Sequence, residues 1–208
     1  MSDGRPHSRW ILAPLTGAWL AAVAAGMGIL IRYSAISGDV GMPPPSWPSE
    51  TSIARTARRP ILILMAHPRC PCTRATMEEL ARLMRRMSGR IEARVVFYAP
   101  AGVAEDWWKS DIWTSAAAIP GVTAILDTDA VEARRFHVET SGHALLYDAS
   151  GRLLFSGGIT MARGHAGDNA GEDWVEAVMR GDPSIAKTTS VFGCRLRSAR
   201  TIPPALEE

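Results

Sequence analysis

The chain has 208 residues and a formal net charge of +2, from 23 basic and 21 acidic side chains. This length is enough for one domain with a sizeable core and additional segments. The balanced charge excludes the strongly basic surface that is typical of nucleic-acid binding, so we expect no nucleic-acid partner. The 3 cysteines allow one disulfide with a free thiol, or one site that uses all three.

The N-terminal segment predicts a membrane anchor. After a short cytoplasmic head, residues 1–9, the run from Trp10 to Ile31 contains no charged side chain. A helix of that length spans roughly 33 Å, enough to cross a hydrocarbon core. The alternative is a secretory signal peptide, but its apolar region is shorter, about 7–15 residues. Arg5 and Arg9 favour a cytoplasmic N-terminus. The rest of the chain is then outside the cytoplasm, where cysteine pairs can oxidise.

Residues 32–59 read as a linker. The stretch "GDVGMPPPSWPSE" contains three consecutive prolines, which favour polyproline II and hence a semi-rigid spacer. A domain over residues 60–181 follows, and residues 182–208 form a tail with little periodicity. Cys194 is the informative residue of that tail.

The domain is predicted to be a compact α/β unit. Its first apolar run, "ILILMA", is typical of a strand buried on both faces. The elements that follow are a helix over residues 73–87, strand "ARVVFYA", helix "AEDWWKSDIWTSAAA", strand "VTAILD", short helix "DAVEARRF", hairpin "HALLYDASGRLLFSGG" and helix "NAGEDWVEAVMRG". Thr76 and Glu79 fit a capping box for the first helix. This order predicts a mixed central sheet flanked by helices.

These features resemble the thioredoxin-like superfamily. A buried strand leads into a cysteine-containing turn that opens a helix, and the hairpin resembles the last two strands of that family. The stretches "HPRCPCTRAT", "AAIPGV", "SGHALLYD", "SGGIT" and "RGHAGDN" resemble a membrane-anchored bacterial branch labelled RedB-like. The resemblance implies a thioredoxin-like fold behind the anchor and a single-pass protein of the bacterial inner membrane, with its C-terminal domain in the periplasm. It also implies thiol–disulfide exchange with exported protein thiols or disulfides.

Two departures from the family are visible. Only Pro71 separates Cys70 from Cys72, where the family places two residues between its cysteines. Arg69 stands where the first family cysteine would be if Cys72 is aligned with the second. Gly142 occupies the place of the cis-proline that the family puts before its hairpin strand, and this leaves His143 near the expected position of the dithiol.

The cysteine turn has the features of a reactive site. A helix N-terminus stabilises a thiolate and lowers its pKa, and Arg69 adds positive charge. We expect Cys70 to be the nucleophile and Cys72 to resolve the mixed disulfide. A disulfide between these two would be strained and easily exchanged. Alternatively, one of them pairs with Cys194, which would hold the tail against the domain.

Metal binding is the main alternative. Thiolates bind soft ions such as Cu(I) or Zn(II), and Cys70 and Cys72 supply two ligands with His67 or His143 as a third. In the exchange interpretation no cofactor is expected. A further alternative is a noncatalytic thioredoxin-fold interaction module.

One loop has no assigned role. Residues Arg163, His165, Asp168 and Asn169 lie close together in "GITMARGHAGDNAGEDW", and Asp168 or Asn169 is expected to cap the last helix. The resemblance places this connection at the opposite end of the sheet from the cysteines, or along its flank.

Overall fold

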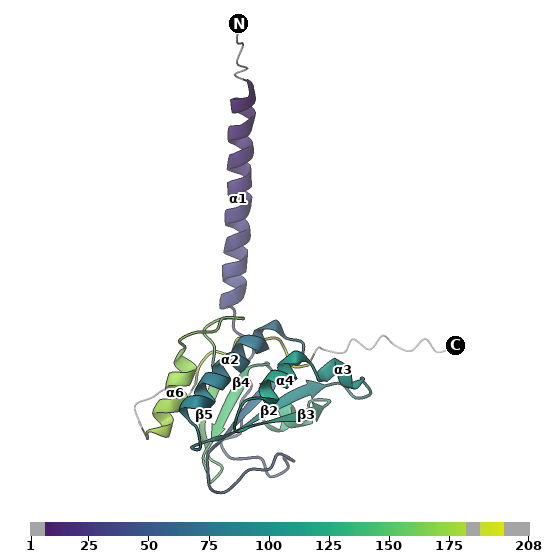
Figure 1. Cartoon of the computed structure of the whole chain (residues 1–208), viewed down its shortest axis with the longest axis vertical. Coiled ribbons are helices and arrows are strands. Elements are labelled where there is room, and N and C mark those ends of the chain that lie inside the picture. Colours follow the sequence, from purple (N-terminus) through teal and green to yellow (C-terminus); the bar gives the residue numbers. More distant parts are fainter. Residues whose placement is uncertain (1–6, 182–187, 198–208) are drawn as a thin grey trace, which may run out of the picture. The chain divides into compact units, whose positions relative to one another are not determined.

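The computed structural model describes residues 7–181 and 188–197, and it divides after Ile36 into two compact units. The first unit is the helix α1 (His7–Ala35), shown in Figure 1. By length and composition its stretch Leu12–Ala35 can cross a membrane. The helix therefore continues past the expected end at Ile31, since no glycine or proline interrupts it there.

The second unit, from Ser37 onward, is built on a five-stranded mixed sheet with the strand order β3-β2-β1-β4-β5. The strands are β1 (Ile61–Ala66), β2 (Glu92–Ala99), β3 (Val122–Thr128), β4 (His143–Tyr147) and β5 (Leu153–Gly158). β1, β2 and β3 are parallel, whereas β4 runs antiparallel to β1 and β5 runs antiparallel to β4. The continuous apolar run of β1 is explained by its central place, because all of its residues are buried. The expected fold class, a mixed sheet flanked by helices, is confirmed.

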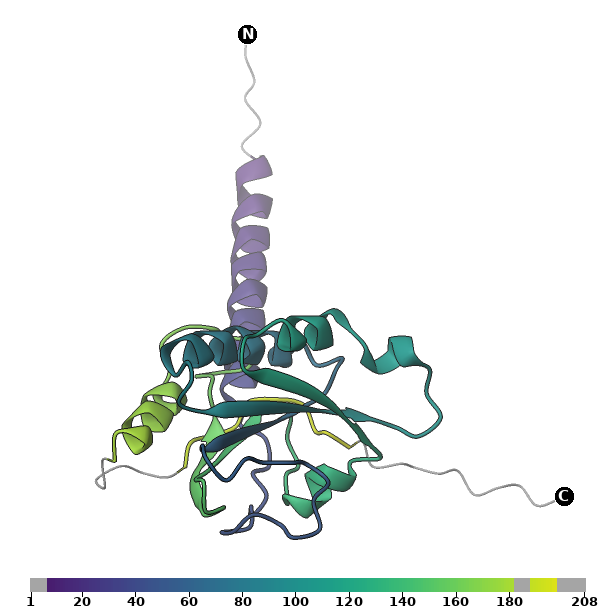
Figure 2. The same ribbon diagram turned by 60° about the horizontal axis from the view of Figure 1, so that its bottom comes forward.

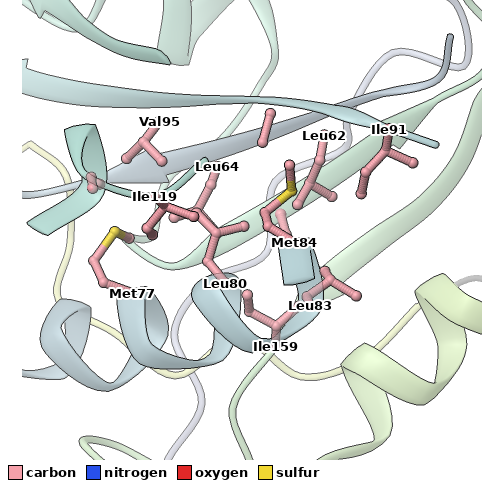
Figure 3. Close-up of a cluster of buried hydrophobic side chains, with 14 of the residues drawn as sticks. Leu62, Leu64, Met77, Leu80, Leu83, Met84, Ile91, Val95, Ile119 and Ile159 are labelled. Carbon is pink, nitrogen blue, oxygen red and sulfur yellow. The ribbon is translucent and has the colours of Figure 1, made fainter. Parts of the chain in front are cut away.

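Each face of the sheet has its own hydrophobic core. The helices α2 (Pro71–Arg86), α4 (Asp111–Ala117) and α6 (Ala170–Met179) supply side chains to one core. In Figure 3, Leu80 and Met84 of α2 point toward Leu62 and Leu64 of β1. The other face is covered by the short helix α5 (Val131–Arg135) and by extended segments, as Figure 2 shows. Alternate residues of β1 therefore face two different layers.

Two helix boundaries differ from those expected. α2 begins at Pro71 with Cys70 as its N-cap, so the capping box at Thr76 and Glu79 is wrong. Proline suits this first position because its missing N–H would have no partner there. The segment expected as one helix is two, α3 (Glu105–Trp108) and α4, because the Ser110 side chain accepts from the Trp113 N–H and starts a new helix.

The segment expected as a spacer lies against the sheet unit. The Trp47 N–H donates to the Gly151 carbonyl at 2.7 Å, and the Leu153 N–H donates to the Pro45 carbonyl at 2.8 Å. The Tyr147 hydroxyl donates to the Pro44 carbonyl at 3.0 Å. The prolines keep this stretch extended, and its free carbonyls and apolar rings provide contacts that a spacer would leave to solvent.

The described part of the tail, residues 188–197, is also docked. It forms bridges from Thr188 to Ser156 and from Arg195 to Thr140, and its Val191 and Leu196 side chains are buried. The tail gains these contacts without forming a regular element, which explains its lack of sequence periodicity. Residues 182–187 and 198–208 of the expected tail lie outside the described residues.

Candidate functional site: a three-cysteine cluster

The cysteine turn follows β1 at the edge of the sheet where β4 begins. The register pairs Met65 with His143, so the loop after β1 and the loop before β4 are neighbours. Cys70 stands at the N-terminus of α2, and its N–H donates to the His67 carbonyl at 3.2 Å. The turn therefore presents Cys70 to the positive end of a 16-residue helix, where a thiolate is stabilised.

Ser141 joins the two loops. Its Oγ accepts from the His67 N–H at 2.8 Å and lies 2.8 Å from the Thr73 Oγ1. The next residue, Gly142, has φ +88° and its N–H donates to the Met65 carbonyl at 2.7 Å. Gly142 thus stands directly before β4, as the alignment with the family expected, in a left-handed conformation that glycine adopts without strain. The described residues contain no cis peptide bond.

The tail brings the third cysteine to this turn. The Sγ atoms of Cys70 and Cys194 lie 2.8 Å apart, and the Ser141 N–H donates to the Cys194 carbonyl at 2.9 Å. Gly193 makes this approach possible, because a Cβ there would lie 1.9 Å from the Ser141 carbonyl oxygen. Of the pairings left open by the sequence, the structure places Cys194 against Cys70.

The three thiols differ in acidity. Burial raises the pKa of Cys70, but hydrogen bonds from Cys194 and Thr73 outweigh it and leave this pKa below its ordinary value. Burial, together with the negative charge of a Cys70 thiolate, raises the pKa of Cys72. Burial and the same neighbour raise the pKa of Cys194 to about 12. Cys70 is therefore the first of the three to become a thiolate.

Arg163 also lies at this site, which corrects the expected place of its loop. The His143–Gly158 pairing shows that the hairpin returns the chain to the edge where β4 began, so the loop after β5 starts beside the cysteine turn. The Arg163 Nη1 donates to the Gly193 carbonyl at 2.6 Å. Its guanidinium also interacts with Cys72, and this interaction opposes the increase in the pKa of that thiol.

A buried carboxylate fixes this loop. Glu79 of α2 is 1% exposed; its Oε1 accepts from the Gly167 N–H at 2.7 Å, and its Oε2 accepts from the Asn169 side chain at 3.2 Å. Asn169 also caps α6 by accepting from the Glu172 N–H at 2.9 Å, as the sequence predicted for Asp168 or Asn169. Glu79 and Asn169 thus tie the Arg163 loop to the helix that carries the cysteines.

The ligands of the alternative metal-binding interpretation, Cys70 and Cys72 with His67 or His143, are not grouped in the described residues. Within residues 7–181 and 188–197, no three His, Cys, Asp or Glu side chains are grouped so that they could hold a metal ion. The His67 ring packs against Tyr98 and Trp107, with ring centroids 5.8 Å and 5.7 Å away. The His143 Nε2 hydrogen-bonds the Ser156 Oγ at 2.8 Å.

The Arg69 side chain contacts Trp107, and none of the hydrogen bonds found among the described residues joins it to a cysteine. Its Nε donates to the Trp107 carbonyl at 3.1 Å, and its guanidinium lies 5.0 Å from the centre of the Trp107 ring. Burial lowers the pKa of His67, and the charge of Arg69 lowers it further. Arg69 therefore orders the outer part of the turn.

Sequence reasoning missed Ser141, Thr73, Gly193 and Arg163 as parts of this site. Ser141 and Thr73 could have been found from the sequence, because Thr73 directly follows Cys72 and Ser141 directly precedes Gly142. The place of Arg163 follows from the hairpin, which must return to its starting edge. Nothing in the sequence signals Gly193, since its role depends on the docking of the tail.

Comparisons with known proteins agree with the fold. No known protein-family profile matches the chain, and no curated protein matches it. An uncharacterized conserved protein from Geobacillus kaustophilus is 15% identical, with a TM-score of 0.57 over 80% of this chain and 94% of that one. A hypothetical protein from Sinorhizobium meliloti 1021 is 18% identical, with a TM-score of 0.55 over 79% of this chain and 97% of that one.

A thioredoxin domain of a thiol-disulfide oxidoreductase from Bacteroides vulgatus is also similar, at 15% identity and a TM-score of 0.41, over 71% of this chain and 99% of that one. The parallel β1–β2 pair, the antiparallel β4–β5 hairpin and the helix that starts at the cysteine turn together form a thioredoxin-like fold. The expected thioredoxin-like fold is therefore confirmed.

Proposed function

We propose that this chain is a membrane-anchored thiol–disulfide exchange protein whose redox pair is Cys70 and Cys194. The observation that carries the proposal is the 2.8 Å separation of their Sγ atoms at the N-terminus of α2. Two sulfurs so placed need only a small adjustment to reach the disulfide bond length of about 2.05 Å. The bond would join the helix entrance to the docked tail.

The chemistry is a two-electron exchange. In the oxidised chain the Cys70–Cys194 bond accepts two electrons from a partner that carries two thiols. Both thiols of the chain are restored and the partner leaves with a disulfide. The reverse reaction reduces a partner disulfide. The lowered pKa of Cys70 favours the reduced chain, because a stabilised thiolate makes the corresponding disulfide more oxidising.

Cys72 is assigned a subordinate role. Its pKa is raised by burial and by Cys70, so at neutral pH it stays protonated and is a weak nucleophile. A bond between Cys70 and Cys72 would close a small, strained ring, whereas Cys194 already lies in contact with Cys70. The resolving role that the sequence suggested for Cys72 therefore passes to Cys194 in this proposal.

The cellular setting follows from α1 and from the resemblance. The apolar helix supports a single-pass anchor in a bacterial inner membrane, and the RedB-like resemblance supports a periplasmic sheet unit. An oxidising compartment suits a functional cysteine pair. The expected partners are thiols or disulfides of exported proteins.

The test uses the full-length chain purified in detergent. The chain is oxidised, free thiols are blocked, and the disulfide is mapped by mass spectrometry; transfer to a dithiol peptide is then timed. Cys70→Ser and Cys194→Ser should each slow transfer about 100-fold or more, because each removes the bond, while Cys72→Ser is the matched control and keeps most of the rate. Equal loss in all three variants, or a mapped Cys70–Cys72 bond, would contradict this assignment.

A further inference from the structure

The two cysteines of the redox pair differ in how a partner can reach them. Cys70 is 1% exposed, and its Sγ lies 2.8 Å from the Sγ of Cys194 in the docked tail. Cys194 belongs to the tail itself and is partly exposed. We propose that an incoming thiolate attacks Cys194 and expels Cys70, so that the mixed disulfide forms on the tail. This inference rests on the proposed function, which supplies the Cys70–Cys194 bond.

The direction of attack supports this choice. A thiolate attacks a disulfide along the S–S axis, from the side opposite the leaving sulfur, and access decides which sulfur reacts. To attack Cys70, it would have to reach a residue that is only 1% exposed. To attack Cys194, it approaches from the side of the partly exposed tail.

The tail holds Cys194 in place during this attack. The Cys194 carbonyl accepts from the Ser141 N–H at 2.9 Å, and the adjacent Gly193 carbonyl accepts from Arg163 at 2.6 Å. On the other side, the Leu196 N–H donates to the Glu139 carbonyl at 2.9 Å. On the tail, these contacts involve only backbone atoms, so they do not depend on the partner of the Cys194 sulfur.

The leaving group supports the same choice. Cys70 departs as a thiolate that accepts hydrogen bonds from the Thr73 N–H and hydroxyl, and these bonds lower its pKa. Exchange is faster when the leaving thiol has the lower pKa. Attack on Cys70 would instead expel Cys194, whose pKa is raised by burial, so it leaves less readily. Access and leaving-group acidity therefore point to the same sulfur.

The complete reaction balances without another reagent. The first partner thiolate forms a bond to the Cys194 sulfur, and the electron pair of the broken bond stays on Cys70. The second thiol of the partner then loses its proton, attacks the partner sulfur of the mixed disulfide and releases Cys194, which takes up a proton. The partner is thereby a dithiol that leaves oxidised by two electrons, while the chain is reduced by two.

The test identifies the sulfur that forms the mixed disulfide. Full-length Cys72→Ser protein in detergent is oxidised, and the Cys70–Cys194 bond is verified by mass spectrometry before the reaction; its absence at this stage would refute the proposed function instead. Reduced glutathione is added for short times, the reaction is quenched with acid, and free thiols are alkylated. We expect glutathione on Cys194 and the alkyl group on Cys70, in about tenfold excess over the opposite pattern.

Three outcomes overturn the inference: glutathione mainly on Cys70, equal labelling of the two cysteines, or a disulfide that stays intact at every glutathione concentration. The earliest time points decide, because the thiolate of Cys70 can later attack the mixed disulfide. The same measurement on the unaltered chain checks that the Cys72→Ser substitution has not redirected the attack.

Discussion

Replacing Gly193 with alanine tests whether the docked tail creates the redox pair. The backbone of Gly193 passes so close to Ser141 that an added Cβ would lie 1.9 Å from the Ser141 carbonyl oxygen. Contacts of this kind below 3.0 Å do not occur, and the obstructing atom is backbone that cannot rotate away. The Gly193→Ala tail must therefore move by about 1 Å or more, and Cys194, the next residue, moves with it.

The expected decrease in the stability of the Cys70–Cys194 disulfide follows from the hydrogen bonds that this movement breaks. The bond from the Ser141 N–H to the Cys194 carbonyl contributes about 1 kcal/mol, and the bond from the charged Arg163 to the Gly193 carbonyl contributes about 1.5–3 kcal/mol. In Gly193→Ala their summed contribution, about 2.5–4 kcal/mol, is lost, and this loss disfavours formation of the disulfide. Since about 1.4 kcal/mol is a factor of ten, the equilibrium constant for the Cys70–Cys194 bond should fall by roughly 60- to 700-fold.

The assay poises the full-length chain in detergent at a series of glutathione ratios. Free thiols are then alkylated, and mass spectrometry gives the oxidised fraction of the Cys70–Cys194 pair at each ratio. For Gly193→Ala, the midpoint should shift toward more oxidising mixtures. The matched control is Gly28→Ala in α1, where an added Cβ meets nothing within 4 Å and the midpoint should stay unchanged.

An unchanged midpoint in Gly193→Ala would refute this reasoning, because it would show that the tail's position does not control the pair. A shift of equal size in Gly28→Ala would refute it as well. In that case the effect would come from a general loss of order and not from the contact with Ser141.

Two further predictions concern charge. Arg163→Gln should raise the pKa of Cys72, whereas Arg163→Lys should keep this pKa close to that of the unaltered chain. The pH dependence of Cys72 alkylation in the reduced chain measures the pKa. Identical profiles for the three proteins would contradict the prediction. Burial lowers the pKa of His143 from 6.5 to about 4. Unfolding exposes this histidine, which then takes up a proton between these pH values, so the unfolding free energy should fall by about 3 kcal/mol as the pH decreases through this window. His143→Gln should lack this loss in urea titrations, and an equal loss in the variant would rule out His143 as its source.

Most of the secondary structure could be predicted from the sequence. The apolar run of β1, the hairpin of β4 and β5, and the amphipathic pattern of α2 identify their elements because burial imposes their periodicity locally. The sequence also marked the Cys70 turn, since a thiol before a proline at a helix entrance is a local pattern. The exact start of α2 was missed, because Glu79 suggested a cap while its carboxylate in fact binds the distant Gly167 and Asn169.

The partners of the cysteine turn, in contrast, depend on how distant parts of the chain pack together. Cys194 is 124 positions away from Cys70 along the chain. It arrives through an extended tail that is held by scattered backbone hydrogen bonds, by two buried side chains and by the close approach at Gly193. Such contacts leave no periodic pattern in the sequence. Arg163 arrives because the hairpin reverses the chain, and the Pro-rich segment packs because the sheet offers a face to cover. Local spacing indicated a pair at Cys70 and Cys72, whereas the fold placed Cys194 against Cys70, because proximity in space is set by the register of the strands and the docking of the tail.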